Sequence, residues 1–155
     1  MNFADTNWLR AMFLRTDDHK DREDTVERFH RRDNSQVGLS HVVLLEARNV
    51  FCRITGEQEP PEWALLQDGF SGRFYVDPMN WDLVRRNTLA LFSRYAHKST
   101  LGTFDMALLA SAQLAGATRI LSFDETLKAV AVAEGLEVFP PLTAEGRQIL
   151  AALRS

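Results

Sequence analysis

Residues 118–139, TRILSFDETLKAVAVAEGLEVF, contain an apolar strand, a helix and a second apolar strand in one stretch. We expect a strand over Thr118–Leu121 and a helix over Glu125–Glu134. Gly135 ends the helix, and Leu136–Phe139 form the next strand. Two strands joined through a helix pair in parallel, because the chain must cross the face of the sheet before it pairs again. This stretch therefore predicts a parallel sheet covered by helices.

The same alternation of strands and helices runs through the rest of the chain. Further short apolar strands are predicted at Asn2–Ala4, Val37–Ser40 and Phe74–Val76. The spacing of apolar residues predicts helices at Trp8–Arg15, within the charged stretch Thr16–Asp33, at His41–Ile54, from Pro60 through Leu66, at Trp81–His97, at Thr103–Ala115 and at Thr143–Leu153. Without a repeat or a long linker, residues 1–155 are predicted to form a single domain, a three-layer α/β/α sandwich with a mainly parallel central sheet.

Composition and charge limit the classes of function. A chain of 155 residues that is 45% hydrophobic can bury a core. The net charge of −3 argues against a duplex-DNA binder held mainly by lysine and arginine. The chain has no apolar run long enough to span a membrane, no secretory signal, and only one cysteine, Cys52. We therefore expect a cytoplasmic protein with no membrane partner.

Acidic residues lie where the predicted strands give way to helices. Asp5 follows the first strand, Asp124 follows the strand over Thr118–Leu121, and Asp105 stands at the start of the most buried helix. Ligands of parallel sheets bind beyond the carboxyl ends of the strands. Carboxylates gathered there suit Mg²⁺ or Mn²⁺, which prefer oxygen ligands and can activate a water to attack a phosphodiester.

These three aspartates also have an ordinary structural explanation. Asp5 and Asp124 suit the N-cap position of the helices that follow them. Asp105 would be favoured near a helix N-terminus by the helix dipole alone, although the stretch from Leu101 to Leu114 offers it no charged partner. The sequence leaves both explanations open.

Glu46 lies inside a helix, on the same face as Val42 and Val50. That face is the apolar stripe of the helix, where a carboxylate is costly unless it is paired or bound to a metal. The ordinary alternative to a metal ligand is a salt bridge to an arginine.

Four segments resemble, in order, the four motifs of PIN domains. The segments are Phe3-Ala4-Asp5-Thr6-Asn7, Leu39-Ser40-His41-Val42-Val43-Leu44-Leu45-Glu46, Thr103-Phe104-Asp105-Met106-Ala107-Leu108-Leu109-Ala110-Ser111-Ala112 and Ile120-Leu121-Ser122-Phe123-Asp124. The size and layout resemble most the VapC-type toxins of prokaryotic toxin–antitoxin pairs. The chain departs from the family at Trp8, where an aliphatic residue is commoner, in the charged stretch Thr16–Asp33 and in a longer tail after Phe139.

The resemblance implies an endoribonuclease that uses Mg²⁺ or Mn²⁺ and metal-activated water to hydrolyse the phosphodiester bonds of single-stranded or structured RNA. It also implies a homodimer and a small VapB-like antitoxin that blocks the site. The resemblance implies that the catalytic and metal-binding residues are Asp5, Glu46, Asp105 and Asp124. It also implies that Thr6, Asn7 and Ser122 support these acids through hydrogen bonds.

Two other functions are compatible with the same residues. One is a catalytically silent PIN-like module that binds RNA or a partner protein. The other is a phosphohydrolase with an aspartyl nucleophile, which usually needs a second aspartate two residues after the first, where this chain has Asn7.

Basic and aromatic residues could contact RNA, but solvated faces, ion pairs and core packing are the commoner explanations. We expect Trp63, Tyr75 and Trp81 to be core residues rather than base-stacking ones. The candidate phosphate contacts are Arg10, Arg15, Arg48, Arg53, Arg85, Arg86 and Lys98.

Overall fold

A five-stranded parallel sheet forms the centre of the molecule, as a computed structural model of residues 1–155 shows. The strands are β1 (Asn2–Ala4), β2 (Val37–Leu39), β3 (Phe74–Val76), β4 (Arg119–Leu121) and β5 (Glu137–Phe139). They lie in the order β3-β2-β1-β4-β5, and all four neighbouring pairs are parallel. The predicted parallel sheet is confirmed, without any antiparallel strand.

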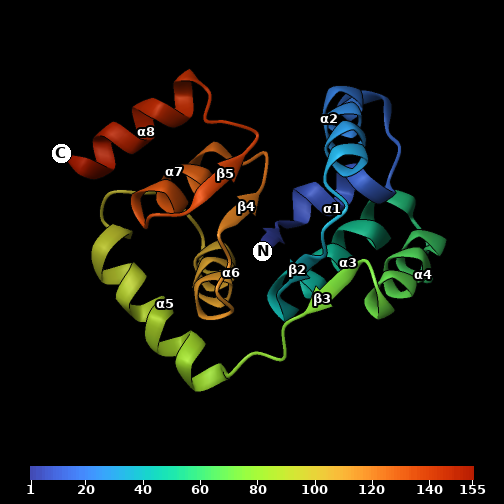
Figure 1. The fold of residues 1–155 in the computed structure, drawn as a ribbon, viewed down its shortest axis with the longest axis horizontal. Helices are drawn as coiled ribbons and strands as arrows, with labels where there is room; N and C mark the ends of the chain where they lie inside the picture. The colour runs from blue at the N-terminus through green and yellow to red at the C-terminus, as the bar shows by residue number, and fades with distance from the viewer.

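Helices connect the strands and cover both faces of the sheet. They are α1 (Thr6–Phe13), α2 (Lys20–Arg32), α3 (His41–Thr55), α4 (Pro61–Asp68), α5 (Trp81–Tyr95), α6 (Thr103–Leu114), α7 (Glu125–Ala133) and α8 (Ala144–Arg154), with 3-10 turns at Asp17–His19 and Gly69–Ser71. Figure 1 shows α1 to α4 on one side of the strands and α5 to α8 on the other. The molecule is therefore the three-layer α/β/α sandwich that the sequence predicts. None of its helices is both long and apolar enough to span a membrane.

The strand order changes direction between β1 and β4. From β1 the chain builds outward through β2 to β3, then returns to the other side of β1 to form β4 and β5. Such a reversal opens a crevice at the carboxyl ends of the two central strands, because the connecting helices leave to opposite faces. Asp5 leaves β1 at this point, and its backbone N–H donates to the carbonyl of Leu121 at the end of β4 (3.0 Å).

Close packing of β1 against β2 fixes the position of β1. The ring of Phe3 is fully buried and lies across Gly38 of β2. A Cβ atom at position 38 would lie 2.1 Å from a carbon of that ring, so only glycine fits there. Phe3 precedes Asp5 by two residues, and the contact therefore helps to fix where β1 delivers the carboxylate.

The helix boundaries differ from the predicted ones where caps decide them. The helix expected to begin at Trp8 begins at Thr6, because the Asp5 side chain accepts from the Thr6 backbone N–H. The charged stretch forms a 3-10 turn and then α2, which confirms the helix predicted within it and buries Val26 and Phe29. It also buries Glu23, whose carboxylate accepts from the backbone N–H of Thr16 (3.0 Å).

The core prediction was wrong for two of three aromatic residues. Trp63 packs against the core, where its ring meets Phe51 edge to face. Trp81, the first residue of α5, is 58% exposed, and Tyr75 is 36% exposed. Tyr75 lies on β3, an edge strand whose outer face is only partly covered, so its aromatic character did not lead to burial.

Candidate metal centre

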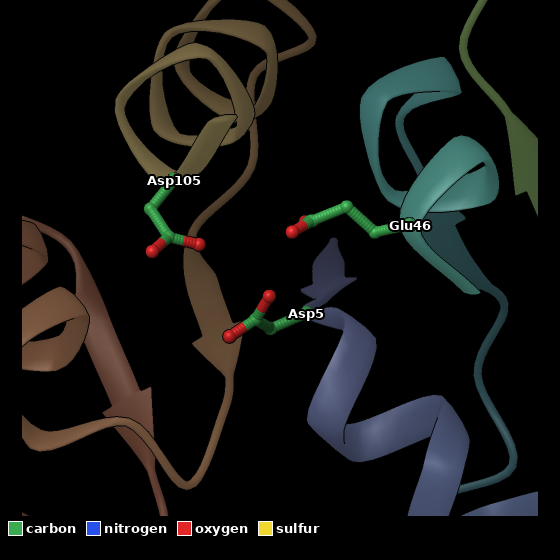
Figure 2. A group of neighbouring side chains, drawn as sticks. All are labelled: Asp5, Glu46 and Asp105. Carbon is green, nitrogen blue, oxygen red and sulfur yellow. The ribbon is translucent and has the colours of Figure 1, made fainter. Parts of the chain in front are cut away.

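Three carboxylates from distant parts of the chain point toward one another at the carboxyl edge of the sheet (Figure 2). Asp5 directly follows β1, Glu46 comes from the second turn of α3, and Asp105 comes from the first turn of α6. One oxygen of each lies within 4.8 Å of the others. These are three of the four acids that the sequence nominates, and we call them the acidic cluster.

Asp5 is the most buried member of the acidic cluster, at 4% exposure. Its Oδ1 accepts from the backbone N–H of Thr6 (2.7 Å), and its Oδ2 accepts from the Ser122 hydroxyl (2.9 Å). Burial raises the pKa of Asp5 to about 6, although these two bonds oppose the rise, and the negative charges of Glu46 and Asp124 add to it. Asp5 thus caps α1 and faces the cluster with the same side chain.

Glu46 has a neutral partner rather than a charged one. Its Oε1 accepts from the Thr6 hydroxyl (3.2 Å), and no lysine or arginine pairs with it. The salt bridge that was the ordinary explanation for Glu46 is therefore absent. Half-burial raises the pKa of Glu46 above its usual value, because the charged form loses solvation.

Asp105 has no partner within the protein. Its carboxylate makes no hydrogen bond and no ion pair, and the N-cap of α6 is Gly102, which brings no side chain. Partial burial raises the pKa of Asp105 to about 7, and the negative charges of Asp5, Asp124 and Glu46 raise it further. A carboxylate held among like charges without a compensating donor destabilises the fold unless a proton or a cation binds there.

Asp124 lies at the same edge of the sheet, but its carboxylate accepts hydrogen bonds from a helix N-terminus. Its Oδ1 accepts from the backbone N–H groups of Thr126 (2.9 Å) and Leu127 (3.1 Å), so it is the N-cap of α7. The capping explanation therefore describes this carboxylate correctly, and Asp124 stands outside the acidic cluster. Its charge is still close enough to raise the pKa of both Asp5 and Asp105.

Ser122 and Asn7 join the turns that follow β4 and β1. The single hydroxyl proton of Ser122 is donated to Asp5, while its oxygen accepts from the backbone N–H of Asp124 (3.0 Å) and weakly from Asn7 Nδ2 (3.4 Å). Asn7 Oδ1 accepts from the backbone N–H of Phe123 (3.0 Å). These bonds fix the Asp5 and Asp124 carboxylates relative to each other. The Thr6 hydroxyl orients the Glu46 carboxylate through its own hydrogen bond.

No cation of the protein neutralises these acids. None of the four takes part in an ion pair, whereas several arginines considered for RNA binding are engaged with other carboxylates. Those pairs are Arg10–Asp18, Arg15–Glu27, Arg48–Glu59 and Arg85–Asp82. Three hard oxygen donors with uncompensated charge fit a divalent ion such as Mg²⁺ or Mn²⁺.

Sequence reasoning missed a contact between two side chains at the carboxyl edge of the sheet. The ring of Phe123, between Ser122 and Asp124, carries the guanidinium of Arg22, whose Cζ lies 5.2 Å from the ring centroid. Arg22 belongs to α2 and is far from Phe123 in sequence, so no spacing pattern could have connected them.

The sequence of residues 3–133 matches the family model described as the PIN domain. No curated protein sequence matches the chain.

Three solved structures illustrate the likeness of fold. One is Mycobacterium tuberculosis VapC20, a sarcin-ricin loop cleaving toxin, with a TM-score of 0.69 and 19% identity over 88% of this chain and 96% of that one. Another is FitAcB of Neisseria gonorrhoeae, with a TM-score of 0.60 and 16% identity over 91% and 98%. The third is VapBC2 of Rickettsia felis bound to a fragment of promoter DNA, with a TM-score of 0.59 and 15% identity over 88% and 96%. Identities this low establish a shared fold.

Proposed function

The chain belongs to the PIN-domain family, and from this membership together with the acidic cluster we propose that it is a metal-dependent endoribonuclease, the toxin of a toxin–antitoxin pair. The proposal rests above all on Asp105. Its carboxylate has no donor or cation in the protein, yet it points at two further carboxylates. A structural role would give it a cap or an ion pair, as the first-turn acids Asp82 and Glu125 have, so a bound cation is the best explanation of its position among like charges.

In this proposal Asp5, Glu46 and Asp105 hold Mg²⁺ or Mn²⁺, and Asp124 adds negative charge from the adjacent turn. The ion would lower the pKa of an attacking water and offset the charge that develops on the phosphodiester. Thr6 and Ser122 orient the carboxylates of Glu46 and Asp5 through the hydrogen bonds described above. Burial and the neighbouring carboxylates raise the pKa of Asp105 to about 7, so at neutral pH a proton and a metal ion would compete for this carboxylate.

The substrate and partners follow by analogy with the similar structures. VapC20 cleaves the sarcin-ricin loop, which supports RNA as the substrate class here. VapBC2 and FitAB were both solved on DNA, which supports a small DNA-binding antitoxin as the partner of this chain. We also expect the protein to form a homodimer and to act in the cytoplasm.

The decisive experiment is cleavage of a mixed-sequence single-stranded RNA by the purified protein with Mg²⁺, Mn²⁺ or EDTA. We expect cutting with either metal, none with EDTA, and a loss of about 100-fold or more in the Asp105→Asn variant. Asp82→Asn is a matched control, because Asp82 also stands in the first turn of a helix but is exposed and paired with Arg85 (3.7 Å).

Two results would overturn the proposal. Full activity of Asp105→Asn at the wild-type metal requirement would remove the acidic cluster from the reaction. RNA binding without cutting under either metal would instead indicate a silent RNA-binding module.

A further inference from the structure

Two of the three departures from the family pattern, Trp8 and the charged stretch Thr16–Asp33, meet at Phe123, in the turn that follows β4. Trp8 is fully buried and stacks on Phe123, with ring centroids 5.4 Å apart and planes inclined by 17°. Its indole N–H donates to His30 Nε2 (3.1 Å), which fixes the ring. The charged stretch contributes Arg22 of α2, whose guanidinium lies over the same Phe123 ring at 5.2 Å. Trp8 thus supports a phenylalanine on which an arginine rests.

This arginine lies at the same edge of the sheet as the acidic cluster. Phe123 stands between Ser122, which donates to Asp5, and Asp124, the cap of α7. Its backbone N–H is held by Asn7. Since this turn follows β4, Arg22 is seated at the carboxyl edge of the sheet, where the proposed reaction takes place.

Arg22 differs from most arginines of the molecule that lie over aromatic rings. Arg48, Arg94 and Arg119 also rest on such rings, but each pairs with a carboxylate, at 3.3, 2.7 and 3.2 Å. Arg22 makes no hydrogen bond and no ion pair, so all of its guanidinium donors remain available. Its side chain is half-buried and therefore already restricted, so it loses less conformational entropy when it binds a phosphate.

We propose that Arg22 binds a backbone phosphate of the RNA that flanks the scissile phosphate, an inference that rests on the proposed nuclease function. A planar guanidinium stacked on a ring matches the geometry of phosphate oxygens and is always charged. The acidic cluster can contact phosphate only through its ion. Arg22, a cation at the same edge of the sheet, supplies a second contact that sets the register of the RNA strand. Arg22 is then a substrate-positioning residue, and the Trp8–Phe123 stack is its support.

The test compares Arg22→Gln and Arg22→Lys with Arg73→Gln. Arg73 is the matched control, because it also lies over a ring, that of Phe74 at 6.0 Å, without a carboxylate partner. It precedes β3 and therefore lies at the opposite edge of the sheet. Steady-state cleavage of single-stranded RNA with Mn²⁺ would be measured over a range of salt, together with anisotropy of a fluorescein-labelled RNA in EDTA, which does not depend on cleavage.

We expect Arg22→Gln to raise KM and the dissociation constant by about tenfold with kcat nearly unchanged, as befits loss of one phosphate contact. The slope of log affinity against log salt should fall by about 0.7, the share of one phosphate on a single strand. Arg22→Lys should keep the salt slope, and Arg73→Gln should resemble the wild type.

Wild-type KM and salt slope in Arg22→Gln, with or without a lower melting temperature, would show that Arg22 only packs, and would leave the nuclease proposal intact. Equal losses in Arg73→Gln would show a diffuse charge effect and would also overturn the inference. A wild-type protein that binds RNA without cutting it would remove the nuclease proposal, while the anisotropy would still decide the Arg22 contact. A wild-type protein that neither cuts nor binds RNA would overturn both.

Discussion

Helices α6 and α7 begin at the same edge of the sheet, and each carries an aspartate near its first residue, yet the two carboxylates have opposite surroundings. Asp124 accepts two backbone N–H groups and closes its own helix. Asp105 accepts nothing, and its pKa rises to about 7. The comparison teaches that position at a helix start does not separate a cap from a ligand. What differs between these two is the hydrogen bonding that the fold supplies to each carboxylate. Asp5, which caps α1 and still faces the acidic cluster, shows that capping alone does not exclude a ligand.

The largest difference should appear in metal binding. Asp105→Asn should weaken the affinity for Mn²⁺, measured by isothermal titration calorimetry, by more than about 100-fold, since it removes a proposed ligand. Asp124→Asn keeps the cap and removes only a neighbouring charge, so we expect about a tenfold loss. Equal losses in the two variants would place both carboxylates on the ion and end the distinction.

A smaller difference, of opposite sign, should appear in the stability of the metal-free protein near pH 7.5. Asp124→Ala should destabilise the fold by about 1 kcal/mol through loss of the cap, which lowers the melting temperature by about 3 °C for a chain of this size. Asp105→Asn should melt at the wild-type temperature or higher, because it removes an uncompensated charge. Asp124→Asn, which can still cap, is the control. A clear loss of stability in Asp105→Asn would indicate a structural role that the geometry does not show.

A further difference concerns the pH dependence of that stability. The pKa values of Asp5 and Asp105 are raised in the folded state to about 6 and about 7, so the folded protein binds more protons than the unfolded chain between about pH 4 and 7. The stability they contribute is therefore complete below pH 4 and is lost as pH rises toward 7. Denaturant titrations across this range should show a shallower fall in Asp105→Asn than in wild type, and a smaller reduction of the fall in Asp124→Asn, which removes only a neighbouring charge. Identical slopes in all three proteins would contradict the raised pKa of Asp105.

The sequence predicted the order of strands and helices well, because short apolar runs and their glycine ends are local signals. The strand Phe74–Val76 was located to the residue, and the helix predicted over His41–Ile54 is α3, which Gly56, with a φ of 70°, ends after Thr55. The start of α1 was misplaced by two residues, because the cap formed by Asp5 decides it.

The candidate site could be predicted only in part. Asp5 and Asp105 were expected at the carboxyl edge from the strand pattern, and Glu46 from its place on an apolar helix face. Nothing in the sequence could separate the role of Asp124 from theirs, since a cap and a ligand both need an aspartate after a strand. The sequence also could not show that Glu46 pairs with a threonine hydroxyl rather than with an arginine.

The sequence by itself determined a parallel α/β sheet and the set of acids at its carboxyl edge, because periodicity and strand ends depend on neighbouring residues alone. The tertiary structure alone decided which side chains meet. It left Asp105 without a partner, exposed Trp81, and seated Arg22 on Phe123. Those outcomes depend on how elements distant in the chain pack together, and burial and hydrogen bonding across such contacts set the charge and the availability of each group.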